Sequence, residues 1–381
     1  MTSEFTARRF VLEKLTEWVS GVVPRKEALP IHGCIRVTVA PDGLQFVATD
    51  TERTVFASSP SVSTSSEGVV YLPAQRLKAI LAEAPDGDIT IRVKADYAEV
   101  AATGGATWSL KLPVSTEYAK LPDVESAGFA PVSREKLLSA LRTVRYAAGR
   151  DSSQPAFAQV HLAESAGAVY ATASSGGRYS RAPVPGFPFE TSIPTAALDD
   201  LIKLLSVSSM DDVQVAELDD PATGLTLVFR AGPVTLAVLG FTQKFPDQDR
   251  LVLAPAQGNK DQLGADRGEL QTALRRVRIN ADATTSAVGL VLADGSLTLE
   301  ARDETGNRAQ ETIKVTWAGG DRLLVINAQF LLDMLAVHPG KSCVFRVGKD
   351  EGKRRAALLL EDAASGVTGV IPQMQPSLVG R

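Results

Sequence analysis

The sequence has few of the residues on which metal and redox sites depend, with two cysteines and three histidines in 381 residues. Cys34 and Cys343 lie far apart in apolar surroundings, which favours buried free thiols in a reducing cytoplasm over a disulfide. None of His32, His161 and His338 stands at metal-ligand spacing from a cysteine or another histidine. We therefore expect no metal site and no cofactor.

Long apolar runs and a strong net charge are also missing. No run of about 18 apolar residues occurs, so we expect no transmembrane helix and no membrane partner. The opening stretch, MTSEFTARRFVLEKL, has charges among its apolar residues and does not resemble a signal peptide. A formal net charge of −4 argues against a general nucleic-acid coat, but it leaves room for one local basic surface.

Signals of catalysis are weak. HPGKS, residues 338–342, resembles the end of a phosphate-binding loop, but Leu335 stands where that loop requires glycine. The acidic pairs on predicted turns, at 50 with 52 and at 303 with 304, have no histidine or metal partner and are typical of turn formers. We expect no catalytic residue, and an enzyme on this chain is the least favoured of the functions considered.

The most informative feature is an internal repeat of a basic helix. SREKLLSALRTVRY (133–146) and DRGELQTALRRVRI (266–279) align without gaps, and RRFVLEKLTEWVSGV (8–22) is a first copy. Shared apolar positions would indicate only a shared fold. Three arginines are shared as well, because Arg134, Arg142 and Arg145 fall on Arg267, Arg275 and Arg278. Their recurrence predicts a shared role.

Two further units recur in the same order. Helical segments follow Pro73, Pro194 and Asn327, where a helix start suits the fixed φ of proline. Alternating strand-and-turn segments occupy 43–55, 167–180 and 295–310. The chain therefore consists of three copies of roughly 120–130 residues, each ordered helix, strands, helix, strands, with linkers at 123–133 and 254–266. Several strands between helices predict an α+β fold with antiparallel sheets.

The recurring arginines favour contact with a polyanion. Long cations commonly flank a buried stripe, so the alternative for any single helix is a solvated face. A merely solvated face need not keep the place of its charges from copy to copy, which favours the binding interpretation. No base-reading motif is evident, and arginines spread over repeated helices suit phosphate contact without sequence preference. Such contacts can be exchanged along a duplex.

A family resemblance rests on motifs that run nearly from end to end: ALPIHG, VATDTER, LPAQRL, LPVSTEYAKLP, AAGRD, FTQKFPDQDRLVLAP, RDETG, VINAQFLLDML and VIPQM. By their order and spacing the chain resembles the bacterial DNA polymerase III beta subunit, the sliding clamp. The resemblance implies three repeated clamp-type domains, each of antiparallel sheets with two helices, at 1–124, 130–254 and 262–381. It also implies a head-to-tail homodimeric ring around duplex DNA, in the cytoplasm and associated with the nucleoid.

The family's function then implies a processivity factor without its own catalytic site. Its partners would be double-stranded DNA, a second copy of the chain, and the polymerase, clamp loader and repair factors that bind through a short peptide motif. For DNA we expect contacts from Arg25, Lys26, Arg134, Arg142, Arg145, Arg150, Arg267, Arg275 and Arg278. At the junction between chains, Trp108 and Leu110 should meet Ile279, although Trp108 could equally be a core residue.

The resemblance also places a peptide groove, for which Phe157 and Leu251 would otherwise be taken as core. The residues that it implies are Phe157, Ser174, Gly176, Gly177, Arg178, Tyr179, Pro246, Leu251, Ile371, Pro372, Gln373 and Met374. This chain departs from the family there, with Ser175 in place of an aspartate, Gly177 in place of a histidine, and a polar Gln373. The alternative function is therefore a clamp paralogue with an altered groove, acting as an inhibitor-resistant, regulatory or decoy clamp.

Overall fold

The computed structural model describes residues 4–24, 30–60, 63–64, 66–114, 117–149, 154–220, 224–241, 243–349 and 356–375. Arg25, Lys26 and Arg150, for which DNA contact was predicted, lie outside these ranges. Within the described part, no helix is both long and apolar enough to cross a membrane. Both cysteines are free and buried, as predicted. Burial raises the pKa of Cys343 to about 11.

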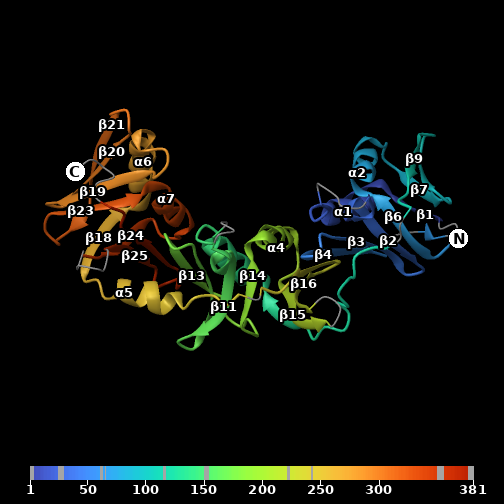
Figure 1. Cartoon of the computed structure of the whole chain (residues 1–381), viewed down its shortest axis with the longest axis horizontal. Coiled ribbons are helices and arrows are strands. Elements are labelled where there is room, and N and C mark those ends of the chain that lie inside the picture. The colour runs from blue at the N-terminus through green and yellow to red at the C-terminus, as the bar shows by residue number, and fades with distance from the viewer. Residues whose placement is uncertain are drawn as a thin grey trace. The chain divides into compact units, whose positions relative to one another are not determined.

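Each repeat opens with a short strand that runs directly into a helix (Figure 1). The helices were predicted, but the strands were not, because four to six residues are too few to show a clear alternation. The pairs are β1 (Glu4–Arg8) with α1 (Arg9–Ser20), β10 (Ala130–Ser133) with α3 (Arg134–Val144), and β18 (Asp261–Asp266) with α6 (Arg267–Val277).

The two predicted linkers are therefore partly wrong. The ends of the stretches 123–133 and 254–266 are the paired strands β10 and β18. The second stretch also begins with a helical turn, α5 (Ala254–Gln257), which continues the π-helix η3 (Asp249–Leu253). Small and polar residues, read as signs of a loop, here occupy short elements that are held by their neighbours.

Antiparallel strands follow the first helix of every repeat, as predicted. In the first repeat they are β2 (Cys34–Ala40), β3 (Gly43–Thr49), β4 (Arg53–Ser59), β5 (Ser63–Thr64) and β6 (Gly68–Pro73). In the second they are β11 (Gln159–Ser165), β12 (Ala168–Ser174), β13 (Tyr179–Pro183) and β14 (Thr191–Pro194). In the third they are β19 (Ala287–Ala293), β20 (Ser296–Arg302), β21 (Arg308–Lys314), β22 (Thr316–Trp317) and β23 (Arg322–Asn327). Short 3₁₀ turns precede them at η1 (Pro30–Gly33), η2 (Pro155–Phe157) and η4 (Arg278–Asn280).

The second helix begins directly after the equivalent positions 73, 194 and 327, which confirms the predicted helix starts. Asn327 caps its helix, since its Oδ1 accepts a hydrogen bond from Phe330 N at 3.0 Å. The helices are α2 (Ala74–Glu83), α4 (Thr195–Val207) and α7 (Ala328–Val337). The closing strands are β7 (Asp88–Val93), β8 (Tyr97–Ala102) and β9 (Thr107–Lys111); β15 (Asp212–Asp220), β16 (Gly224–Ala231) and β17 (Val234–Leu239); and β24 (Ser342–Val347), β25 (Ala357–Glu361) and β26 (Thr368–Pro372).

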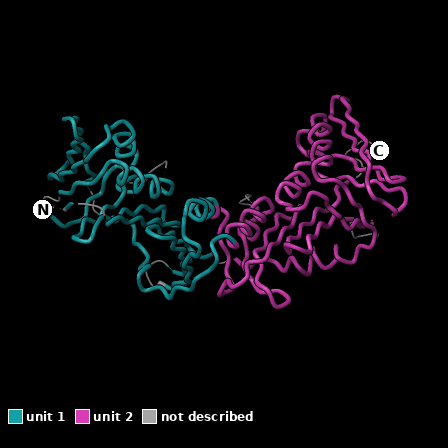
Figure 2. Tube along the Cα trace, turned by 180° about the vertical axis from the view of Figure 1, so that it is seen from behind, with its two compact units in different colours: residues 1–135, 199–240 teal, residues 136–198, 241–381 magenta. Residues whose placement is uncertain are grey.

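The chain forms two compact units, which Figure 2 colours separately. One comprises residues 1–135 and 199–240, and the other comprises 136–198 and 241–381. The boundary passes through α3 and α4, so that the second repeat contributes to both units. Compact units and sequence repeats are therefore different divisions of this chain, and the three-domain division stays a prediction.

One sheet in each unit extends from one repeat into the next, and the other belongs to a single repeat. In the first unit the strand orders are β5-β1-β7-β8-β9 and β10-β15-β16-β17-β4-β3-β2-β6. In the second they are β14-β11-β12-β13-β26-β25-β24-β18-β22 and β21-β20-β19-β23. The joins are equivalent: β17 pairs with β4, with Leu236 opposite Val55, and β26 pairs with β13, with Gly369 opposite Ser180. Every pairing is antiparallel, which confirms the predicted α+β class.

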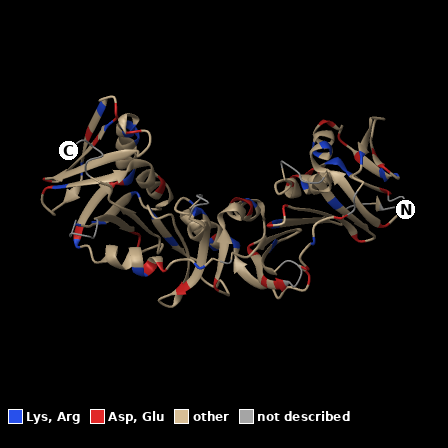
Figure 3. Ribbon diagram, viewed as in Figure 1, with Lys and Arg blue, Asp and Glu red and all other residues tan. Residues whose placement is uncertain are grey.

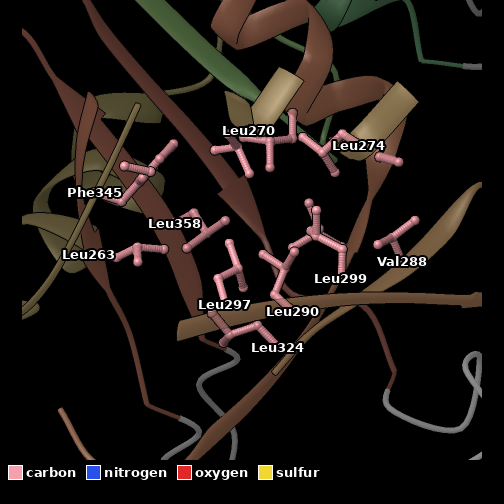
Figure 4. Close-up of a cluster of buried hydrophobic side chains, with 14 of the residues drawn as sticks. Leu263, Leu270, Leu274, Val288, Leu290, Leu297, Leu299, Leu324, Phe345 and Leu358 are labelled. Carbon is pink, nitrogen blue, oxygen red and sulfur yellow. The ribbon is translucent and has the colours of Figure 1, made fainter. Parts of the chain in front are cut away.

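Leucine-rich packing holds the first helix of the third repeat in place (Figure 4). Leu270 and Leu274 of α6 point toward Leu290 and Leu299 of the neighbouring sheet, and all four are at most 1% exposed. Each such side chain contributes about 1.5–3 kcal/mol through its burial. The opposite face of α6 is left to polar and charged side chains.

Candidate functional site

The exposed faces of α3 and α6 carry equivalent arginines. In α3 the buried stripe includes Leu137, Leu141 and Val144, and Arg142 is exposed. In α6 the stripe includes Leu270, Leu274 and Val277, with Arg275 exposed. Figure 3 shows lysine and arginine on α6, and also on α2, the second helix of the first repeat. Arg145 lies just beyond α3 and is half-buried, whereas Arg278 is exposed on η4 and donates to Gln329 Oε1.

An arginine is the first residue of the first helix in each repeat, and it bonds to the second helix of the same repeat. Arg9, Arg134 and Arg267 each donate through Nη1 to a carbonyl oxygen in the last turn of the second helix of the same repeat. The acceptors are Leu81 O at 3.0 Å, Leu205 O at 3.1 Å and Leu335 O at 3.2 Å. The last carbonyls of a helix lack partners within the helix, and a cation there also interacts favourably with the helix dipole. Arg134 and Arg267, which were predicted to contact DNA, therefore cap helices.

Removing the cap should cost stability. We expect Arg267→Met to lower the free energy of unfolding by about 1–2 kcal/mol, because the Leu335 carbonyl loses a charged donor. Arg275→Met on the exposed face of the same helix is the matched control and should change it by less than about 0.5 kcal/mol. Urea denaturation of both variants measures the difference, and equal losses would show that Arg267 is no cap.

A cavity of about 240 Å³ lies in the second unit, at the predicted peptide groove. Five of the predicted groove residues line it: Ser174, Gly176, Arg178, Leu251 and Pro372. The rest of the lining was not predicted and consists of Val252, Pro255, Ala256, Asn259, Lys349, Ala357 and Val370. Four of these belong to 252–259, a stretch whose residues from 254 onward were predicted to be a linker. An apolar wall with a few polar groups at its rim is typical of a site for an extended peptide.

Tyr179 forms part of the support beneath this cavity. It is fully buried and packs in a cluster with Leu253, Ala256 and Leu359. Its hydroxyl donates to Asp249 Oδ1 at 2.5 Å. Burial, followed by the charge and hydrogen bond of Asp249, raises the pKa of Tyr179, so the phenol stays protonated.

Asp249 ties the π-helix to the sheet. Its Oδ2 accepts from Arg181 Nη1 and from Ser165 Oγ, each at 3.0 Å. Next to it, the buried Ser174 Oγ donates to Gln248 Oε1 at 3.0 Å. These polar contacts fix the segment that carries Leu251, whose side chain is 58% exposed at the cavity.

Arg178 is held in place at the cavity rim from three sides. Its Nε donates to Ser175 Oγ at 3.2 Å and its Nη1 donates to Asp333 Oδ2 at 3.2 Å. The guanidinium carbon lies 4.5 Å from the centre of the Phe330 ring. A Cβ atom on Gly177 would stand 3.0 Å from that same ring. A larger side chain at position 177 would therefore crowd the Phe330 ring.

The other predicted groove residues do not line the cavity. Ile371 is 1% exposed in the core of the third repeat, and Gln373 is buried and donates its N–H to Ala356 O. Met374 packs beside the buried pair Ala287 and Val325. Phe157 and Pro246 are half-buried and also lie outside the cavity lining.

Two of the strands at sheet edges bear on the predicted junction between chains. In the first unit β9 is the last strand of its sheet, and in the second unit β21 is the last strand of another. Trp108 and Leu110 of β9 line a cavity of about 670 Å³ together with residues of α2. Ile279 in η4, close in sequence to α6, is 77% exposed. Trp108 and Leu110 thus lie on an edge strand of the first unit, and Ile279 lies in an exposed turn of the second unit.

Comparison with known proteins gives a consistent result. A family model described as DNA polymerase III beta subunit, N-terminal domain, matches residues 3–122, and one described as its C-terminal domain matches residues 253–371. The beta sliding clamp of Chlamydia muridarum is 23% identical over 338 residues, covering 87% of this chain and 89% of the relative. That of Synechococcus elongatus is 25% identical over 332 residues, covering 83% and 85%.

Solved structures share the fold at low sequence identity. The beta sliding clamp of Caulobacter crescentus superposes with a TM-score of 0.89 at 20% identity, covering 98% of this chain and 99% of the other. The DNA polymerase III subunit beta of Pseudomonas aeruginosa gives 0.87 at 21% identity, covering 98% and 100%. A sliding clamp of the same organism, with a TM-score of 0.85 at 22% identity and coverage of 98% and 100%, was crystallised bound to griselimycin.

Proposed function

The chain belongs to the DNA polymerase III beta subunit family, and we propose that it is a sliding clamp that encircles duplex DNA and tethers the replicative polymerase. The observation that carries this proposal is the way in which the repeats join. At both joins inside the chain, the third long strand of one repeat pairs with the last strand of the next. Applied between chains, the same pairing assigns a partner to β9 and to β21.

By that rule β21 and β9 are complementary. β21 is equivalent to β4 and β13, while β9 is equivalent to β17 and β26. Pairing β9 of one chain with β21 of another repeats the joins already present, and two chains that do this at both ends close head-to-tail into a homodimeric ring. Matching the turns of the hairpins places Trp108 opposite Ala309 of the second copy, as Leu236 stands opposite Val55.

The positive charge on α3 and α6, the first helices of the second and third repeats, fits contact with DNA. Arg142 and Arg275 are exposed on faces away from the buried stripes, and Arg145 and Arg278 follow them. Contacts of this kind are non-specific and can be exchanged between phosphates, while a closed ring retains its cargo without tight binding. In this function the chain needs no catalytic group, and it acts in the cytoplasm on the nucleoid.

Retention on circular DNA tests the proposal directly. We expect the protein, once loaded by a clamp loader on nicked circular DNA, to co-elute with the DNA through gel filtration in moderate salt. Linearising the circle with a restriction enzyme should release it, because a ring slides off an end. Loss from circles and linear DNA at equal rates would rule out encirclement.

A second candidate function is a clamp paralogue with an altered partner set, and its basis is the departure from the family pattern at Ser175, Gly177 and Gln373. The cavity residues Leu251 and Pro372 suit the apolar side chains of a short peptide motif from polymerase, clamp loader or repair factors. Fluorescence polarisation with a clamp-binding peptide of the polymerase separates the two functions. Micromolar binding supports the tether, and no binding at high micromolar peptide supports the regulatory or decoy clamp.

A further inference from the structure

Two ion pairs occupy equivalent positions at the joins within the chain. In the first unit Arg53 Nη1 donates to Asp200 Oδ2 at 2.6 Å, and in the second Arg178 Nη1 donates to Asp333 Oδ2 at 3.2 Å. Both acids are the sixth residue of a second helix, α4 or α7. Both arginines close the hairpin that precedes the joining strand, since their carbonyls accept the turn hydrogen bond from Asp50 N and Ser175 N.

Both ion pairs are partly buried, and a further hydrogen bond holds each arginine in place. All four side chains are only 20–27% exposed. A turn residue holds the arginine in both cases. Arg53 Nε donates to Asp50 Oδ2 at 2.9 Å, and Arg178 Nε donates to Ser175 Oγ at 3.2 Å. Burial works against the charge on Arg53, but Asp50 and Asp200 outweigh it and the pKa of Arg53 is raised. A held, partly buried pair contributes more than an exposed one.

The third repeat has an equivalent hairpin, with one more residue in its turn and without the arginine. Asn307 occupies the equivalent position, since its carbonyl accepts from Asp303 N, and its Nδ2 donates to Asp303 Oδ2 at 2.7 Å. The sixth residue of α2 is Ala79, which lines the cavity beside β9. If β21 of one chain joins β9 of another, these two positions face each other and neither carries the charge found at the other joins.

We propose that the arginine–aspartate pair is a lock that secures the joins within the chain, and that the join between chains is built without it. This inference rests on the proposed ring. The join has other charged residues on both sides, but none of them occupies the lock positions. They are Arg76, Lys78 and Glu83 on α2, Lys111 on β9, and Asp303, Glu304 and Arg308 on the hairpin. Two of the three kinds of join therefore have this ion pair, and the one between chains lacks it.

Installing the missing lock tests the inference. We expect Ala79→Asp with Asn307→Arg to lower the dissociation constant of the dimer about three- to tenfold below the value that the two single variants predict together. The gain should shrink at high salt, because it is electrostatic. Subunit exchange between fluorescently labelled dimers measures the dissociation rate of the wild type, both single variants and the double variant. A slower dissociation rate is the expected sign of the tighter dimer.

The matched control is Ala79→Asn with Asn307→Arg, which keeps size and polarity at position 79 without the acid. This control should show no salt-dependent gain. If the protein is dimeric and the effects of the two single variants simply add, the proposed lock is overturned. The proposed ring would not be affected by that result. A wild-type chain that stays monomeric at high micromolar concentration would overturn the ring, and the lock with it.

Discussion

Ile279→Asp is expected to convert the protein into monomers and to abolish its retention on circular DNA. The side chain is 77% exposed in the single chain, so the change should not disturb folding. At the proposed join it would be buried beside Trp108 and Leu110. Losing about 1.5–3 kcal/mol of burial at each of two joins weakens a two-chain ring by roughly 100-fold or more, before the cost of burying a carboxylate.

Light scattering coupled to gel filtration gives the mass, and the circular-DNA assay gives retention. Val207→Asp is a matched control, since Val207 is another exposed apolar residue, 58% accessible at the end of α4. It should leave both mass and retention unchanged. An Ile279→Asp protein that remains a dimer with wild-type retention would show that η4 lies outside the join.

The second large effect is expected from charge reversal on the first helices. Arg142→Glu combined with Arg275→Glu should leave the melting temperature within about 2 °C, because both side chains are exposed. Binding to duplex DNA should fall more than tenfold. The slope of log affinity against log salt should also decrease by about 4, at ~0.9 for each of about four lost phosphate contacts in the ring.

A control with the same change in net charge separates local contact from overall repulsion. Lys244→Glu with Arg250→Glu alters two exposed cations, one shortly before the π-helix and one within it. Its salt slope should match the wild type. Equal slopes for all three proteins would remove the first helices from the DNA interface, and a large fall in melting temperature would mean that these arginines are structural.

The repeat made most of the fold predictable. Helix positions followed from stripes such as Leu137, Leu141 and Val144, and from the helix starts at 73, 194 and 327. Strands β10 and β18 were missed because they are too short to show a clear alternation, and only their pairing partners define them. The extension of sheets across repeats depends on edges that meet in three dimensions, and no local pattern records this.

The candidate site was predictable in part, for a related reason. Arg134 and Arg142 look alike in sequence, yet one reaches the Leu205 carbonyl and the other is exposed. Only distance to the second helix separates a cap from a surface charge. In the groove, Leu251 and Pro372 lie at the cavity as the resemblance implied. Ile371 and Pro372 are neighbours in β26, so their side chains point to opposite faces of the sheet. Ile371 therefore points into the core.

Sheets that cross from one repeat to the next make the repeat a unit of sequence and not a unit of folding. A fragment ending near residue 124 would retain β4 without the strand β17 that covers its outer edge. Unpaired edges of this kind favour aggregation. Single repeats on separate chains would therefore need strands from other copies to complete the sheets that cross a join. Fusion of repeats into one chain would have turned assembly between molecules into folding within one.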